Sequence, residues 1–217
     1  MNTLYLICGK AGSGKTYISK LMEKDYHIKR LKKVTTRPRR DGEDDSEYEF
    51  ITKEKYDTIV SGGNMLESKF NVVDKNGEQN ATWYYAVLPP ELNESNDYLA
   101  VVDSQMIQNV DFDLLKSTFC AKYIYILYIT ADAETRLERC IVRNNNPNYA
   151  EICRRFIAES KEYKFLDNLS LHKYLPANVD YIKLDNTNSD INFWDGISGE
   201  LLTVIINCNR YKTNSMP

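Results

Sequence analysis

Continuous runs of apolar residues, rather than alternating ones, mark three positions along the chain. Residues 4–8, 98–102 and 123–129 are apolar and rich in residues that favour strands. Such runs are typical of strands that are covered on both faces, as in a parallel sheet. A shorter run at 181–184 predicts a last strand of the same kind.

Helical periodicity follows the first and third of these runs. Apolar residues recur on one side of the segment 17–24, and Asp132 is a suitable N-cap for a helix that runs towards Arg143. Strands that alternate with helices predict an α/β fold with a mostly parallel central sheet, whose ligands bind at the carboxyl ends of the strands. A further helix is expected near the C-terminus, where apolar residues recur at helical spacing at Trp194, Ile197, Leu201 and Ile205.

The segment 42–90 differs from this pattern and predicts a small β-rich insertion. Short strands are expected at 48–51 and 71–73, and a returning strand at 82–87. Asn76-Gly77 between the last two is a strong signal for a two-residue hairpin turn.

A polar stretch at 144–148 separates two arginine-bearing helical segments and suits a mobile lid. The predicted organisation is an α/β core at 1–36 and 91–210 that includes a lid at about 136–160, a β-rich subdomain at 37–90, and a flexible tail at 210–217.

Composition narrows the function classes. The chain has 217 residues and a formal net charge of −3, which argue for one α/β domain and against a general nucleic-acid binder. No apolar run is long enough to span a bilayer, and the chain begins directly in a predicted strand, so we expect a cytoplasmic protein without a membrane partner. The five cysteines form no Cys-x-x-Cys pair, which makes a structural zinc site unexpected and suggests free thiols.

The segment Gly9–Thr16 carries the clearest chemistry, because it reads Gly-x-x-x-x-Gly-Lys-Thr between a predicted strand and a predicted helix. Backbone N–H groups of such a loop, with the helix N-terminus, bind phosphate groups. Lys15 then reaches the outer phosphates, and the Thr16 hydroxyl holds Mg²⁺. A glycine-rich turn without a ligand is the alternative, which the complete motif and its flanks disfavour. The expected ATP-binding residues are Gly9, Lys10, Ala11, Gly12, Ser13, Gly14, Lys15 and Thr16.

A second group of residues points to another phosphate. Arg37, Arg39 and Arg40 lie within four residues, shortly before Tyr48. Arginine forks and a tyrosine hydroxyl are suited to grip a phosphate dianion. A solvated basic patch is the alternative.

These motifs, taken in order, resemble the guanylate kinase family. The resemblance spans about residues 4–185 and rests on a Thr-Thr-Arg-x-x-Arg-x-Gly-Glu motif with a Tyr-x-Phe, followed by five shorter matches. They are Thr35–Glu43 with Tyr48-Glu49-Phe50, then Met65-Leu66-Glu67, Tyr84-Tyr85, Val102-Asp103-Ser104-Gln105, and the lid segments Arg136–Arg139 and Arg154-Arg155-Phe156.

The resemblance implies a P-loop NTPase-like three-layer fold with a β-rich monophosphate-binding insertion and a helical lid. It also implies roles for individual residues. Glu67 and Asp103 would accept hydrogen bonds from guanine. The catalytic residues would be Lys15, Arg37, Arg136, Arg139 and Arg155, and the residues that bind the acceptor would be Arg37, Arg40, Glu43, Tyr48, Glu67, Tyr85 and Asp103.

Departures from the family pattern fall where the base would be read. Val101 replaces the first aspartate of the family's pair, and Ala86-Val87 replaces a glycine and a hydroxyl residue. Lys33 stands where a small hydroxyl residue is common, and the family spacing puts the second lid arginine at Cys140 rather than Arg139. Phosphate binding is therefore better supported than a strict choice of guanine.

The resulting expectation is transfer of the γ-phosphoryl group of ATP, with Mg²⁺, to GMP or dGMP. Two alternatives stay open: a kinase for another acceptor, such as a different deoxynucleotide or a ribosyl bisphosphate, and a non-catalytic guanylate-kinase-like interaction module. The expected partners are small-molecule nucleotides, and the sequence leaves monomer and homodimer equally open.

Overall fold

The computed structural model of the chain describes residues 2–39, 47–63, 65–73, 79–90, 96–143, 147–167 and 175–187. Within these ranges a five-stranded sheet forms the centre of the molecule, and every neighbouring pair of its strands is parallel. The strand order is β2 (Lys29–Arg30), β7 (Tyr98–Val101), β1 (Asn2–Cys8), β8 (Ala121–Thr130) and β9 (Val179–Asp185). The predicted strands at 4–8, 98–102, 123–129 and 181–184 are confirmed.

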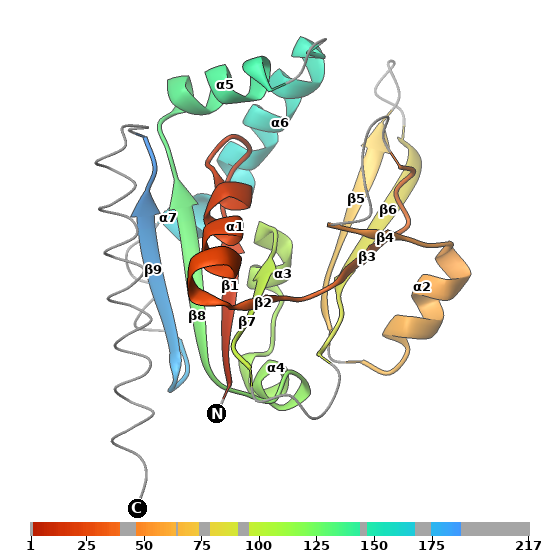
Figure 1. Ribbon diagram of the computed structural model, residues 1–217. Coiled ribbons are helices and arrows are strands. Elements are labelled where there is room, and N and C mark those ends of the chain that lie inside the picture. The colour runs from red at the N-terminus through yellow and green to blue at the C-terminus, as the bar shows by residue number, and fades with distance from the viewer. Residues whose placement is uncertain are drawn as a thin grey trace, which may run out of the picture.

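Apolar residues on both faces explain why the central strands read as continuous runs. Along β1, Tyr5 and Ile7 pack with Ile18 of α1 (Lys15–Tyr26) on one face. Leu4 and Leu6 pack on the other face, where α3 (Ser104–Gln108), α4 (Phe112–Thr118) and α7 (Lys164–Asp167) bring buried side chains to the same cluster. Helices therefore cover both faces of the sheet, which gives the predicted three-layer α/β fold (Figure 1).

The second sheet has four strands in the described ranges and stands apart from the central sheet (Figure 1). Its order is β4 (Glu49–Phe50), β3 (Lys33–Thr35), β6 (Gln79–Val87) and β5 (Leu66–Val73), with α2 (Lys53–Val60) on one face. The antiparallel pairing of β5 with β6 confirms the predicted hairpin, although its Asn76-Gly77 turn lies outside the described residues. The chain enters this sheet at β3, slightly before the predicted boundary at residue 37.

Two helices follow β8 at the carboxyl end of the central sheet (Figure 1). They are α5 (Ala133–Val142) and α6 (Tyr149–Glu162). Asp132 caps α5 as predicted, because its carboxylate accepts a hydrogen bond from the Thr135 N–H at 2.7 Å. The helix expected around 194–205 and the tail at 210–217 lie outside the described residues. No helix in the described part of the chain has the length and apolar character needed to cross a membrane.

Candidate functional site

A cavity of about 460 Å³ lies where the loop after β1, the second sheet and α6 meet. It is lined by residues of the phosphate loop, of β3 and the hairpin, of the segment after β7, and of the lid helix. Eight of the residues predicted to form the site line it: Gly9, Lys15, Thr16, Arg37, Tyr48, Tyr85, Asp103 and Arg155. Segments that are far apart in the sequence thus contribute to one site at the carboxyl end of the parallel sheet, as expected for this architecture.

The phosphate loop has the backbone that its glycines permit. Gly12 has a φ of 77°, and a Cβ at this position would lie 2.4 Å from the Arg136 carbonyl oxygen. Gly14 has a φ of 96° and occupies the N-cap position of α1. Residues other than glycine rarely adopt these backbone angles. The loop therefore packs tightly on α5 and leads directly into the N-terminus of α1, where a helix favours an anion.

Lys15 lies at the end of this loop, and backbone carbonyl groups bind its ammonium group. Its Nζ donates hydrogen bonds to the Gly9 carbonyl at 2.6 Å and the Lys10 carbonyl at 3.0 Å. Burial lowers the pKa of Lys15 to about 8, and the nearby Glu159 carboxylate opposes this shift. A cation in such poorly hydrated surroundings interacts strongly with an incoming phosphate.

Arg136 and Arg139, both predicted lid arginines, contact the backbone around the loop. The Arg136 Nε donates to the Ala11 carbonyl at 3.0 Å, and its guanidinium is buried against the Phe156 ring. Arg139 donates to the Asn186 carbonyl at 2.9 Å. Neither residue is among those that line the cavity. Both arginines therefore contact the backbone of the loop and do not line the cavity.

The arginines that do line the cavity are Arg143, Arg154 and Arg155. Arg155 was a predicted site residue, whereas Arg143 and Arg154 were not. Arg143 is the C-cap residue of α5. One feature of the sequence pointed to Arg143. It lies at the end of the helix predicted to begin at Asp132, next to the polar stretch at 144–148. Three glutamates of α6, Glu151, Glu159 and Glu162, line the same side, and Arg154 is paired with Glu151, so this side of the cavity carries charges of both signs.

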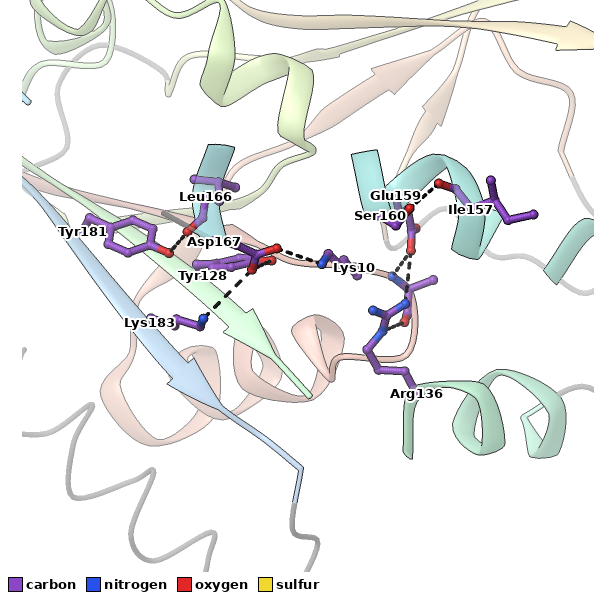
Figure 2. Close-up of polar contacts among 11 residues, drawn as sticks. Lys10, Tyr128, Arg136, Ile157, Glu159, Ser160, Leu166, Asp167, Tyr181 and Lys183 are labelled. Atoms are coloured by element: carbon purple, nitrogen blue, oxygen red, sulfur yellow. Dashed lines mark hydrogen bonds and ion pairs between the residues drawn. The ribbon is translucent and has the colours of Figure 1, made fainter. Parts of the chain in front are cut away.

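Two carboxylates, one on α6 and one on α7, bind the phosphate loop directly (Figure 2). The Ala11 N–H donates to Glu159 Oε2 at 2.8 Å, and the same carboxylate forms an ion pair with Arg136 at 3.8 Å. The Lys10 Nζ donates to Asp167 at 3.1 Å, and Asp167 also accepts a hydrogen bond from the Tyr128 hydroxyl at 3.0 Å. Neither carboxylate was predicted from the sequence, because acidic residues on a helix carry no signal of the loop that they will contact.

On the opposite side of the cavity, Arg37, Tyr48 and Tyr85 come together as predicted. Arg37 is buried, and its guanidinium lies 5.6 Å from the centre of the Tyr48 ring and 5.2 Å from that of Phe50. The Tyr48 and Tyr85 rings meet edge to face, with their centres 6.1 Å apart. Stacking on aromatic rings fixes the plane of the guanidinium fork. Arg40 and Glu43, which were also predicted to bind the acceptor, lie outside the described residues.

The two carboxylates predicted to read the base lie in different places. Asp103 lines the cavity, caps α3 through the Met106 N–H at 3.0 Å, and accepts a hydrogen bond from the Ser68 hydroxyl. Burial raises its pKa. Glu67 instead accepts a hydrogen bond from the Tyr56 hydroxyl at 3.0 Å, on the face of the hairpin that is covered by α2.

Strand pairing explains the position of Glu67. Ser68 pairs with Tyr85, so both side chains lie on the same face of the hairpin, and Tyr85 lines the cavity. Because side chains alternate along a strand, Glu67 pairs with Ala86 and points to the opposite face. The structure therefore brings Asp103, but not Glu67, to the cavity.

Lys33 is the most unexpected residue in the cavity wall. Its side chain is 95% buried, since its relative exposure is 5%, and its Nζ lies 4.1 Å from the centre of the Tyr48 ring and 3.7 Å from a Glu47 oxygen. Burial lowers its pKa to about 8, and Glu47 partly opposes this effect. In the sequence, Lys33 was noticeable only as a departure from the family pattern.

The arrangement provides two groups of cations on opposite walls of one cavity. Lys15 and the lid arginines Arg143, Arg154 and Arg155 face the side of the loop, whereas Arg37 and Lys33 belong to the second sheet. Two phosphate-bearing molecules can be held against each other in such a site. No group of three or more histidine, cysteine, aspartate or glutamate side chains able to hold a metal ion occurs among the described residues.

Known proteins with similar sequences are guanylate kinases. The chain is 34% identical to the guanylate kinase of Hydrogenovibrio crunogenus over 114 residues, which is 50% of this chain and 51% of that relative. It is 27% identical to the guanylate kinase of Vibrio parahaemolyticus over 183 residues, which is 82% of this chain and 81% of the relative. The first alignment thus spans about half the length of the relative, and the second spans most of it. No protein-family model matches the chain.

A solved structure supports the fold. The crystal structure of guanylate kinase from Anaplasma phagocytophilum matches 93% of this chain and 85% of its own chain, with a TM-score of 0.53 at 20% identity. At this identity the likeness supports the fold alone. Together, the sequence relatives and this structure show that the chain is similar to guanylate kinases.

Proposed function

We propose that this protein, which is similar to guanylate kinases, transfers the γ-phosphoryl group of ATP to the 5′-phosphate of a nucleoside monophosphate, with GMP and dGMP as the first candidates. The observation that carries the proposal is the cavity in which the Lys15 loop and the Arg37–Tyr48–Tyr85 group face each other. The names of the relatives agree with it.

The proposed reaction needs no nucleophile from the protein, because the acceptor phosphate already carries negative charge near neutral pH. The protein must hold two anions in line and neutralise the charge of the group in transfer. In this scheme Lys15 and the loop amides bind the donor, and Arg37 orients the acceptor. Arg155 stabilises the developing charge from the lid side.

Thr16 is the residue that would hold Mg²⁺. Its hydroxyl lies in the first turn of α1 and lines the cavity next to Lys15. A hydroxyl together with phosphate oxygens and water is a donor set that suits Mg²⁺, which binds few protein ligands when it accompanies a nucleotide. When bound, the ion would supply additional positive charge at the phosphates.

A kinase for a different acceptor is the second candidate, because Glu67 points away from the cavity. A non-catalytic interaction module is less well supported, since the loop from Gly9 to Thr16 is complete.

The test is ADP formation from ATP and Mg²⁺, measured with a coupled assay in the presence of each common nucleoside monophosphate. We expect ADP formation that depends on the acceptor, with GMP and dGMP among the substrates. ADP formation at the same rate without any acceptor, or none with every acceptor, would contradict the proposal. Calorimetric titration with ATP separates a kinase from an interaction module, because the module should not bind it.

A further inference from the structure

The base-reading part of the cavity contains one buried cation and one buried carboxylate. We propose that Lys33 and Asp103 together select acceptors whose base carries a ring carbonyl next to a ring N–H group, and that they do not read the 2-amino group of guanine. This inference rests on the proposed function, since it concerns the acceptor of the same site. It makes Lys33 a specificity-determining residue.

Lys33 and Asp103 are placed to act on one ligand. Both line the cavity. Lys33 reaches it from β3, beside the Tyr48 ring, and Asp103 reaches it from the end of β7, on the other sheet. They lie close enough for their charges to interact, because Lys33 opposes the rise that burial causes in the pKa of Asp103.

Each of the two groups has free bonding capacity. An ammonium group has three donors, and the contacts of the Lys33 Nζ with Glu47 and with the Tyr48 ring leave room for a carbonyl oxygen. A carboxylate has about four acceptor positions. Asp103 uses three of them for the Met106 N–H, the Ser68 hydroxyl and the Gln105 N–H, and the remaining one can accept from a ring N–H.

The pair distinguishes two classes of base by their hydrogen-bonding edges. Guanine, hypoxanthine, uracil and thymine present a carbonyl acceptor beside an N–H donor, which matches a cation beside a carboxylate. Adenine and cytosine present the reverse order, an amino donor beside a bare ring nitrogen. With these bases the ammonium would meet a donor and the carboxylate would meet a lone pair. Buried polar groups that are left without a hydrogen-bond partner in this way cause strong discrimination against adenine and cytosine.

Besides Asp103, the acceptor wall carries one carboxylate among the described residues, Glu47, and this group forms an ion pair with the Lys33 Nζ at 3.7 Å. Glu67, which would bind guanine by resemblance, bonds to the Tyr56 hydroxyl on the other face of the hairpin. Val101, which lines the cavity, is apolar. Removal of the 2-amino group should therefore have little effect on recognition.

The first experiment compares kcat/KM of the wild-type protein for GMP, IMP, UMP, dTMP, AMP and CMP. We expect IMP to lie within tenfold of GMP, and AMP and CMP to be at least 100-fold poorer than GMP and IMP. AMP or CMP within tenfold of GMP would overturn the proposal. So would IMP more than tenfold poorer than GMP, since that result requires a group that reads the 2-amino position.

The second experiment uses Lys33→Met, which keeps the length of the side chain and removes its charge and donors. We expect the preference for GMP over AMP to fall at least tenfold. Lys32→Met is the matched control, because Lys32 is the exposed neighbour in the chain, and it should keep the wild-type preference. An unchanged preference in Lys33→Met would overturn the proposal. The nucleotide panel on the wild-type protein decides the question by itself if Lys33→Met does not fold.

A binding measurement separates this inference from the proposed function. Trp83 lines the cavity, so its fluorescence should report nucleotide binding without any phosphoryl transfer. Tighter binding of GMP and IMP than of AMP, with no ADP formed from any acceptor, would support the selectivity and contradict the kinase. ADP formation from AMP as fast as from GMP would support the kinase and contradict the selectivity.

Discussion

The donor side and the acceptor side of the cavity are built in different ways. The donor side is a local structure. Eight consecutive residues, Gly9–Thr16, form the loop, and backbone carbonyl groups of the loop accept the hydrogen bonds of the Lys15 ammonium group. The acceptor side is assembled from β3 and the residue Arg37 after it, the segment before β4, the β5–β6 hairpin and the end of β7. A site made of backbone in one segment is set by its motif, whereas a site made of side chains from several strands depends on how those strands pair.

Each side holds one buried lysine, and their partners show the same difference. Lys15 donates to the carbonyl groups of Gly9 and Lys10, which any sequence would provide. Lys33 interacts with the Glu47 carboxylate and the Tyr48 ring, which are particular side chains. The donor site can therefore stay constant while the acceptor site changes by substitution.

The largest effect is expected from Lys15→Met on the donor side. We expect kcat to fall about 100- to 1,000-fold for every acceptor, because the charge that stabilises the transferring group is lost. The measurement is the steady-state rate of ADP formation. Lys20→Met, at an exposed position on the same helix, is the control and should behave as wild type. Turnover close to wild type in Lys15→Met would mean that the donor binds elsewhere.

Arg37→Met should produce the next largest effect and should separate the two sides. We expect KM for the acceptor to rise about 100-fold for every monophosphate, since one charged phosphate contact is lost, and KM for ATP to change little. Arg39→Met is the matched control, because Arg39 stacks on the same Phe50 ring but does not line the cavity. An equal rise in both KM values would show that Arg37 does not belong to the acceptor side alone.

The smallest effect concerns stability and sharpens the comparison of the two lysines. Burial lowers the pKa of Lys33 from 10.5 to about 8, so between these pH values the unfolded chain binds more protons than the folded chain. The contribution of Lys33 to the free energy of unfolding therefore rises as the pH rises from about 8 to 10.5. We expect Lys33→Met to be more stable than wild type by about 3 kcal/mol at pH 7, and this advantage should disappear by pH 10.5.

Urea denaturation of both proteins at several pH values measures this difference. The comparison with the variant is needed, because burial also raises the pKa of Cys8 to about 12, and ionisation of this thiol in the unfolded chain lowers the stability over part of the same range. A difference between the two proteins that stays constant with pH would contradict the prediction.

Local patterns were sufficient to predict the donor loop and most of the central sheet. The apolar runs gave β1, β7, β8 and β9, and Asp132 gave the start of α5, because each signal lies within the segment that it describes. The short elements β2, β3 and α2 were missed. Strands of two or three residues have no periodicity to detect.

The acceptor site could be predicted only in part. The positions of Arg37, Tyr48 and Tyr85 follow from their motifs. The orientation of Glu67 does not, because it depends on which residue of β6 lies opposite. Likewise, nothing local shows that Arg136 will meet the Ala11 carbonyl across 125 positions of sequence. These features arise from tertiary packing, and the assigned roles of the site residues stay predictions until the variants are measured.

The alternation of side chains along β3 has a consequence for how this protein can change in evolution. Lys33 and Arg37 are separated by an even number of positions and both line the cavity, whereas Val34 packs with Tyr56 on the opposite face. A substitution at Lys33 alters one contact and leaves Arg37 in place. Insertion or deletion of a single residue between them would turn one of the two away from the cavity. This segment should therefore vary in sequence among relatives but keep its length.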